Sequence, residues 1–236
     1  MSQYINRTLT VLMVLAVIAV FGMFSASGES VIPILKGTWL EGPLIALGWS
    51  NVIVFNLSIG YLVTAFFWVL VVYTPERKRR KVLRDNLNRR YQEFKEEVIQ
   101  TLLWASVGGH DSRTPRELTD HKKFKAFFDQ DNKTNWYAAL NGLQGSKDRM
   151  RELTLALQML SEEVSYVLNN LPIQDPAVHS LFKVLNESIY RLQHSDGDLY
   201  DQVKHVGGFV WGILARWDFA AGQMEADLIQ EMIDRL

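Results

Sequence analysis

The residue types that could carry catalysis are few and scattered along the chain. There is no cysteine, which excludes disulfides, thiolate metal sites, iron–sulfur clusters and a cysteine nucleophile. The glycine-rich phosphate loops, the zinc motif H-E-x-x-H and the nucleophile elbow G-x-S-x-G are all absent. Ser180 and Lys183 match S-x-x-K, but the companion motifs of that enzyme class are missing. We therefore expect a protein that is not an enzyme and that binds no cofactor.

Metal-ligating residue types are also poorly placed. The histidines show no i,i+4 pair, and we expect surface or core roles for all of them: His110, His121, His179, His194 and His205. His110 followed by Asp111 is the one pair worth testing against a structure. Asp196, Asp198 and Asp201 could gather a cation, but the distal glutamate of an EF-hand loop is missing. A turn and a helix cap explain these three aspartates better, so no metal site is predicted.

Apolar and charged residues are segregated along the chain. The chain has 236 residues with 48% hydrophobic and 22% charged residues, yet almost all charge follows Tyr73. Its formal net charge of −1 makes direct nucleic-acid binding unexpected. This division indicates a membrane protein with a soluble part rather than a soluble globular protein.

Two uncharged stretches are long enough to cross a bilayer. Residues 8–24 would span roughly 26 Å as a helix, and residues 52–73 roughly 33 Å. A signal peptide is the alternative for the first stretch, but its positive n-region and its cleavage site are both weak. The sequence therefore predicts a transmembrane hairpin over 1–75. The apolar loop between the spans is expected to lie along the outer interface, or to prolong the second helix from Pro43.

A basic run follows the second span at once. Residues 76–90 contain eight basic and two acidic residues, whereas the loop 25–50 has a net charge of −1. The positive-inside rule then predicts that residues 76–90 and both termini are cytoplasmic, with the loop on the outside. The run is expected to contact anionic lipid headgroups, in preference to nucleic acid, through Arg77, Lys78, Arg79, Arg80 and Lys81.

Small and polar residues form a stripe on the second span. Asn56, Gly60 and Thr64 recur every four residues and so share one helix face. Such stripes let helices approach closely and hydrogen-bond to each other. Two partners remain open at this point: the first span of the same chain, or another copy of the chain, where the stripe would serve in oligomer packing or line a pore.

Beyond the spans the pattern is helical throughout. Apolar spacings of three and four predict an amphipathic stalk over 76–109 that ends at Gly108 and Gly109, with a kink at Pro75. Residues 110–236 are expected to form a cytoplasmic helical bundle. Its first part should hold a short helix from Thr114 to about residue 128 and turns at 131–133 and 141–142.

Three longer helices should complete the bundle. Ser146 is expected to cap the first helix, Asp175 and Pro176 to start the second, and the third to run from about Leu199 to the end. Within the third, the uncharged run 206–215 should be deeply buried, with Gly208 and Gly212 admitting a close neighbour. The predicted fold class is therefore all-α.

Trp136 and Tyr137 lie in the least regular part of the predicted bundle. An adjacent pair of large aromatic residues is typical of partner-binding anchors, although filling the core would account for them equally well. We therefore carry both residues forward as possible partner contacts.

The arrangement of two spans, a short outer loop, a basic stalk and a cytoplasmic bundle resembles the two-helix membrane effectors of bacterial anti-phage defence, namely SLATT-like and retron-associated effectors. The resemblance covers residues 8–106 and concerns layout, not a motif. It implies a multi-pass protein of the bacterial inner membrane. This protein would be a homo-oligomeric toxin that disrupts or depolarises the membrane, in abortive infection, once a cytoplasmic protein or ribonucleoprotein partner releases it. The alternative, from another class, is a passive anchor or adaptor that recruits a soluble complex through its bundle.

Overall fold

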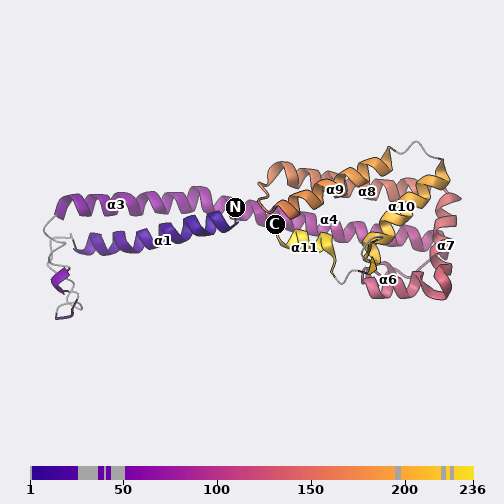
Figure 1. The fold of residues 1–236 in the computed structure, drawn as a ribbon, viewed down its shortest axis with the longest axis horizontal. Helices are drawn as coiled ribbons and strands as arrows, with labels where there is room; N and C mark the ends of the chain where they lie inside the picture. Colours follow the sequence, from indigo (N-terminus) through magenta and orange to yellow (C-terminus); the bar gives the residue numbers. More distant parts are fainter. Residues whose placement is uncertain are drawn as a thin grey trace. The chain divides into compact units, whose positions relative to one another are not determined.

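The computed structural model describes residues 2–25, 37–39, 41–43, 51–194, 198–218, 222–223 and 226–236. Contacts divide the chain into two compact units, residues 1–79 and 80–236. Apart from one pair of two-residue strands, the regular structure of the described residues is helical (Figure 1). The predicted all-α class is confirmed. The loop expected along the outer interface lies largely outside the described residues.

The first unit is a pair of apolar helices, α1 (Ser2–Ser25) and α3 (Asn51–Trp68), that pack against each other. The Tyr61 hydroxyl donates a hydrogen bond to the backbone carbonyl of Leu12 at 3.0 Å. The two helices also approach closely at Gly22, where an added Cβ would lie 2.9 Å from the Ser58 Oγ. Small residues therefore set the spacing of this pair, as they do where apolar helices meet in membranes.

The helix does not end at Trp68. A π-helical turn, η3 (Val69–Tyr73), follows it and leads directly into α4 (Thr74–Ser106). The Thr74 backbone N–H and side-chain hydroxyl both donate to the carbonyl of Val69. Pro75 comes next and has no N–H to donate, so the wider turn lies where an α-helical ladder would be broken. The predicted disturbance at Pro75 thus takes the form of a π-helical turn.

Helix α4 is the central element of the second unit. Its buried apolar residues are the ones that the spacing indicates: Leu83, Leu87, Tyr91, Phe94, Val98 and Leu102, with Ile99 and Leu103 beside them. We expected a stalk over 76–109 separate from a bundle over 110–236, but the compact unit begins at Arg80 and includes most of that helix. The reason is physical, because an apolar stripe on a soluble helix is stable only when other helices cover it.

Three helices follow the end of α4, where Gly108 adopts a left-handed φ of 74°. They are α5 (Thr114–Glu117), α6 (His121–Phe128) and α7 (Gln130–Gln144). The short helix expected from Thr114 to residue 128 is divided, because the Asp120 carboxylate accepts from two backbone N–H groups and starts α6.

The turns predicted at 131–133 and 141–142 are wrong, since both stretches lie inside α7. Gly142 is where α7 touches α4: an added Cβ would lie 2.1 Å from the carbonyl oxygen of Ala105. The glycine therefore serves a close helix contact and not a turn.

Helices α8 (Lys147–Asn170) and α9 (Pro176–Gln193) form a packed pair. Both predicted starts are confirmed, because the Ser146 hydroxyl and the Asp175 carboxylate each accept from a backbone N–H of the first turn. Between the two helices, Asn186 joins the hydroxyls of Ser161 and Ser165 at 2.6 and 2.5 Å. This polar bridge fixes the alignment of the pair within an otherwise apolar interface.

The last part of the chain differs most from expectation. Helix α10 (Leu199–Leu214) is followed by the antiparallel strands β1 (Trp217–Asp218) and β2 (Gly222–Gln223), and then by α11 (Leu228–Asp234). The single helix expected from Leu199 to the end is therefore wrong. Arg216 has a left-handed φ of 53°, the conformation in which helices commonly terminate.

The glycines of α10 also behave differently from the prediction. Gly207 makes the close contact, since an added Cβ would lie 2.6 Å from a methyl carbon of Leu140 in α7. Gly208 and Gly212 instead line a separate apolar pocket beside Phe209 and Ile213. The expected deep burial of the run 206–215 is seen at Val206, Gly207, Val210, Trp211, Leu214 and Ala215.

Candidate functional site

The outer surface of the first unit is apolar on both helices. On α1 the exposed large side chains include Val11, Met13, Val17 and Ile18; on α3 and η3 they include Leu57, Phe66, Phe67, Leu70 and Val71. By length and composition, the helix that starts at Val54 could cross a membrane, and residues 8–24 form a shorter apolar helix. A soluble protein rarely exposes so large a continuous apolar surface. Lipid is the environment that such a surface suits.

The predicted stripe of Asn56, Gly60 and Thr64 is exposed on α3. The Thr64 hydroxyl donates to the carbonyl of Gly60 in its own helix at 2.8 Å, and an added Cβ at Gly60 would have open space around it. Ser58, which is buried, lies on the side that meets Gly22 of α1. At about 100° per residue, the stripe and Ser58 occupy roughly opposite faces of α3. The stripe is thus not the contact that holds α3 to α1.

The predicted basic residues lie in the first turns of α4. Arg77, Lys78, Arg79 and Lys81 are exposed, and Arg80 is half-buried. The Arg80 guanidinium donates to the carbonyl of Pro172, in the connection between α8 and α9, at 3.3 Å. Most of this run therefore presents its charge to the surroundings, as contact with anionic headgroups requires.

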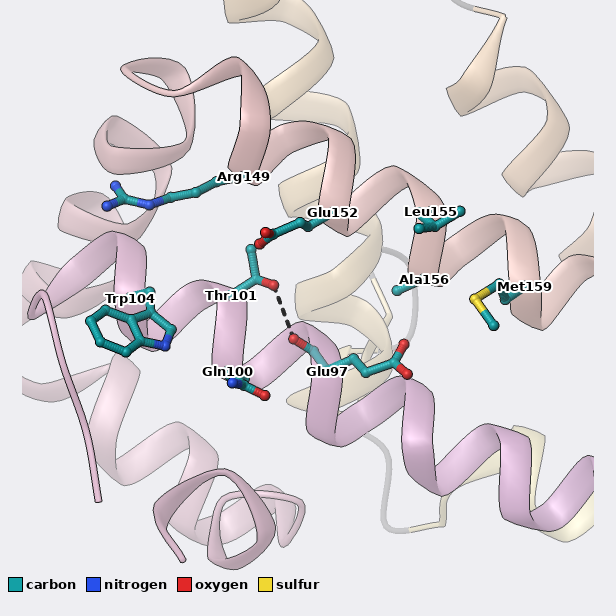
Figure 2. A pocket seen from close by; sticks show the side chains of 9 residues that line it. All are labelled: Glu97, Gln100, Thr101, Trp104, Arg149, Glu152, Leu155, Ala156 and Met159. Atoms are coloured by element: carbon teal, nitrogen blue, oxygen red, sulfur yellow. Dashed lines mark hydrogen bonds between the residues drawn. The ribbon is translucent and has the colours of Figure 1, made fainter. Parts of the chain in front are cut away.

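A hollow with a volume of 580 Å³ lies between α4 and α8 in the second unit. We call it the α4/α8 groove. Its lining residues from α4 are Glu97, Gln100, Thr101 and Trp104, and those from α8 are Arg149, Glu152, Leu155, Ala156 and Met159 (Figure 2). Three of its apolar side chains are exposed to solvent: Trp104 by 45%, Leu155 by 53% and Met159 by 41%.

The charged groups of the groove are arranged unevenly. The Glu97 carboxylate accepts from both terminal nitrogens of the Arg90 guanidinium, at 3.2 and 3.0 Å. Arg149 donates to the carbonyl of Gly142 at 3.4 Å, and Figure 2 shows it directed toward the Trp104 end of the groove. Glu152 points from α8 toward α4 and has no hydrogen bond or ion pair to any described residue. The middle of the groove therefore has an available carboxylate beside exposed apolar side chains.

A second polar arrangement is buried where α11 meets α4. The Tyr91 hydroxyl donates to the Asp227 carboxylate at 2.9 Å, and the Lys95 ammonium lies 3.5 Å from the same carboxylate. Burial first, and then the charge of Asp227, raises the pKa of Tyr91 well above its usual value. Burial lowers the pKa of Lys95 even though Asp227 opposes that shift. A proton held this firmly on Tyr91 suits a structural hydrogen bond and not proton transfer near neutral pH.

Around this arrangement, Gln230 of α11 completes the contact. Its side-chain amide donates to Asn88 at 2.9 Å and accepts from Gln92 at 2.9 Å. The Asp227 carboxylate also accepts from the Gln230 backbone N–H and so caps α11. The seven-residue helix α11 is therefore joined to α4 by polar side chains, and its Ile229, Met232 and Ile233 are buried in the core.

The structure separates the two aromatic residues that could bind a partner. Trp136 is 6% exposed and lies among the rings of Phe124, Phe128 and Trp211, so it fills the core. Tyr137 is 57% exposed. Of this pair, Tyr137 alone remains accessible for a partner contact.

The structure does not gather the residues that were considered for catalysis or metal binding into a site among the described residues. Ser180 and Lys183 are both exposed on α9, and no group of three or more His, Asp or Glu among the described side chains could hold a metal ion. Asp198 caps α10 by accepting from the Asp201 backbone N–H, as predicted, while Asp196 lies outside the described residues. His110 packs edge-on against Trp104 with its Nδ1 near the carbonyl of Asp111, a local contact in the loop after α4.

The sequence did not point to the α4/α8 groove. Leu155 and Met159 lie off the apolar spacing that marks the core face of α8, and Trp104 lies off that of α4. Large apolar residues outside the core face, on two helices with charged neighbours, were the available signal. The pairing of Tyr91 with Asp227 had no signal, because 136 residues separate the two.

Comparison of the chain with protein-family models, with curated proteins and with solved structures finds no match. The site must therefore be interpreted from its own geometry.

Proposed function

We propose that this chain is a membrane-inserted effector without enzymatic activity, and that it self-associates through its apolar helices. The observation that carries the proposal is the apolar surface of α1 and α3, which has no covering element among the described residues. Every backbone group of a membrane-spanning helix must be satisfied within the helix, and small residues let the two helices pack closely. The helical backbones of α1 and α3 and their close approach at Gly22 agree with these requirements.

In this proposal the membrane is the bacterial inner membrane, and α1 and α3 both cross it. The excess of six positive charges over residues 76–90 supports a cytoplasmic position for the start of α4. Both termini and the second unit are then cytoplasmic. The exposed residues of the run Arg77–Lys81 would contact anionic headgroups.

Self-association is proposed to use the stripe of Asn56, Gly60 and Thr64. The stripe is exposed and lies on the face of α3 away from Ser58, which supports a partner other than α1. In lipid, an exposed Asn56 amide gains more from a hydrogen bond to a second copy than from acyl chains. Two spans per chain cannot enclose a pore alone, so an active form that depolarises the membrane needs several copies.

The effector role itself is inferred from the resemblance in layout to two-helix anti-phage effectors. It would act in antiviral defence by abortive infection, with a cytoplasmic protein or ribonucleoprotein partner that restrains it. A second candidate is an adaptor that anchors a soluble complex, and the open α4/α8 groove favours it. Both candidates require a partner for the second unit, but only the effector requires damage to the membrane.

Membrane potential distinguishes the two candidates. The chain is expressed in bacteria and the potential is followed with a voltage-sensitive dye. An effector should depolarise the cells, and replacing Gly60 and Thr64 by leucine should abolish the effect by blocking close approach of the stripe. A matched control replaces Ile59 and Phe66 by leucine, since both are exposed on another side of α3.

Three outcomes carry information. Depolarisation lost in the stripe variant and kept in the control supports an effector that assembles through the stripe. Depolarisation kept in both variants removes the stripe from the proposal. A stable potential and normal growth with the intact chain, at a confirmed level in the membrane, favours the adaptor.

A further inference from the structure

The α4/α8 groove has the form of a site for a helix. Its lining residues extend over two turns of α4, from Glu97 to Trp104, and three turns of α8, from Arg149 to Met159. Helical ligands bind such grooves through apolar side chains spaced along one face. Leu155 and Met159 are one turn apart on α8, and Trp104 faces the groove from the other helix, so a ligand helix would contact apolar groups on both sides (Figure 2).

Two of the exposed apolar residues of the groove, Trp104 and Met159, are of types that are enriched at protein interfaces. Tryptophan, methionine and arginine are enriched at interfaces relative to the rest of a protein surface. The exposed fractions of Trp104, Leu155 and Met159 lie between 41% and 53%, so each still has substantial apolar area to bury. Ala156 also lines the groove and is itself buried, and its small side chain leaves room for those of a ligand.

Charge decides what kind of helix would fit. Glu152 is available inside the groove, and the Glu97 carboxylate also faces it while paired with Arg90. The one cation among the lining residues, Arg149, is bonded to the carbonyl of Gly142. The net charge of the chain beyond residue 90 has the same sign, since residues 91–236 contain 15 basic and 22 acidic residues, a net of −7. A helix with basic residues beside its apolar face complements this groove, and an acidic helix does not.

We propose that the α4/α8 groove binds an amphipathic helix of a partner protein, with leucine-like side chains against Trp104, Leu155 and Met159 and a lysine or arginine beside Glu152. The inference rests on the proposed function only where it identifies this partner with the one that restrains or recruits the chain. Binding itself can be measured without any assay of toxicity, so the two proposals can fail separately.

The test uses the full chain in nanodiscs of phosphatidylcholine, a lipid without net charge that does not attract basic peptides. The probe is a fluorescein-labelled helical peptide of leucine and lysine, about 18 residues long, with leucine on one face. Two further peptides serve as controls: a scrambled sequence of the same composition, and a version with glutamate in place of lysine. Fluorescence anisotropy gives the affinity, and empty nanodiscs give the background.

Two variants locate the binding. L155D places a charge against the apolar face of the peptide and should weaken binding about tenfold, the effect of losing one central apolar contact. E152Q should weaken it less and should reduce its dependence on salt. V184D is the matched control, because Val184 is exposed to a similar extent (55%) on α9, outside this groove. Circular dichroism checks that all three variants are folded.

The proposal stands if the basic amphipathic peptide binds saturably, if the scrambled and acidic peptides bind at least tenfold more weakly, and if L155D but not V184D lowers the affinity. It is overturned if no peptide binds, if the scrambled peptide binds equally well, or if V184D acts like L155D. A change in oligomeric mass of L155D without peptide would assign the groove to a second copy, and that result also overturns it.

Discussion

The contact between Gly142 and Ala105 makes the sharpest prediction about stability. An added Cβ at Gly142 would lie 2.1 Å from the Ala105 carbonyl oxygen and 2.8 Å from its carbon. The nearest favourable carbon–oxygen contacts are about 3.3 Å, so Gly142→Ala requires α7 and α4 to separate by about 1 Å. The obstacle is backbone, which cannot rotate away as a side chain can.

The change that Gly142→Ala makes in the free energy of unfolding follows from two opposing effects. Alanine in the interior of a helix is favoured over glycine by about 1 kcal/mol. Overpacking that moves a backbone costs about 3 kcal/mol or more. The net loss for Gly142→Ala should thus be about 2 kcal/mol, which corresponds to a fall in Tm of about 4–8 °C for a unit of this size.

Two other glycines supply the controls. At Gly145, which ends α7, an added Cβ would make contacts of 3.5 and 3.8 Å, so Gly145→Ala should leave the Tm nearly unchanged. At Gly207 the obstacle is a methyl carbon of Leu140, so Gly207→Ala should fall between the two. The order of the three Tm values is measured by thermal unfolding of the full chain in mild detergent. The unfolding is monitored by the near-ultraviolet circular dichroism of the buried tryptophans. Equal Tm values for the variants at 142 and 145 would refute the close contact.

Further predictions concern titration, capping and the first unit. Because the pKa of Tyr91 is raised, the folded chain keeps this proton above pH 10 while the unfolded chain loses it, so stability falls as pH rises there. Tyr91→Phe should make the free energy of unfolding, measured by urea titration, fall less steeply between pH 9 and 11. An unchanged dependence of that free energy on pH would contradict this prediction. The Asp120 carboxylate caps α6, and its hydrogen bonds to backbone N–H groups lower its pKa. The stability that this cap contributes is therefore fully present above pH 3.8, the ordinary pKa of the group, and is lost as the pH falls through the lowered pKa. Asp120→Ala should therefore cost about 1 kcal/mol at pH 7, and nearly nothing in acid well below that value. Gly22→Leu should separate α1 from α3 at Ser58 and lower the yield of disulfide trapping between introduced cysteines, which this cysteine-free chain reports without background.

Local signals in the sequence proved sufficient where one side chain acts on its own backbone. Ser146 and Asp175 start α8 and α9 because each can satisfy a free N–H group within three residues, and no distant residue alters that. The spacing of Leu83, Leu87 and Tyr91 likewise identifies the buried face of α4. The spacing does not reveal which helices cover the buried face of α4. For that reason the sequence predicted a stalk separate from the bundle.

The failures have two causes: a distant contact can override a local signal, and a feature of the structure can lack any local signal. Asn141 and Gly142 have the composition of a turn, yet the approach of α4 requires a glycine there within a helix. Arg216 ends α10 in a left-handed conformation that glycine normally adopts, so the end of the helix has no signal in the sequence. The direction of the Asn56 stripe relative to α1 also depends on where Gly22 meets α3, which the spacing of either helix alone does not reveal.

The long separation between Tyr91 and Asp227 has a consequence for biosynthesis. A ribosome that has just released α4 must add more than a hundred further residues before the carboxylate that receives the Tyr91 hydroxyl exists. Until then Lys95, which the Asp227 carboxylate contacts in the folded chain, and the part of α4 around it lack this partner. Such a nascent chain is a natural client for chaperones, and a product truncated before Asp227 should be cleared by proteolysis faster than the whole chain.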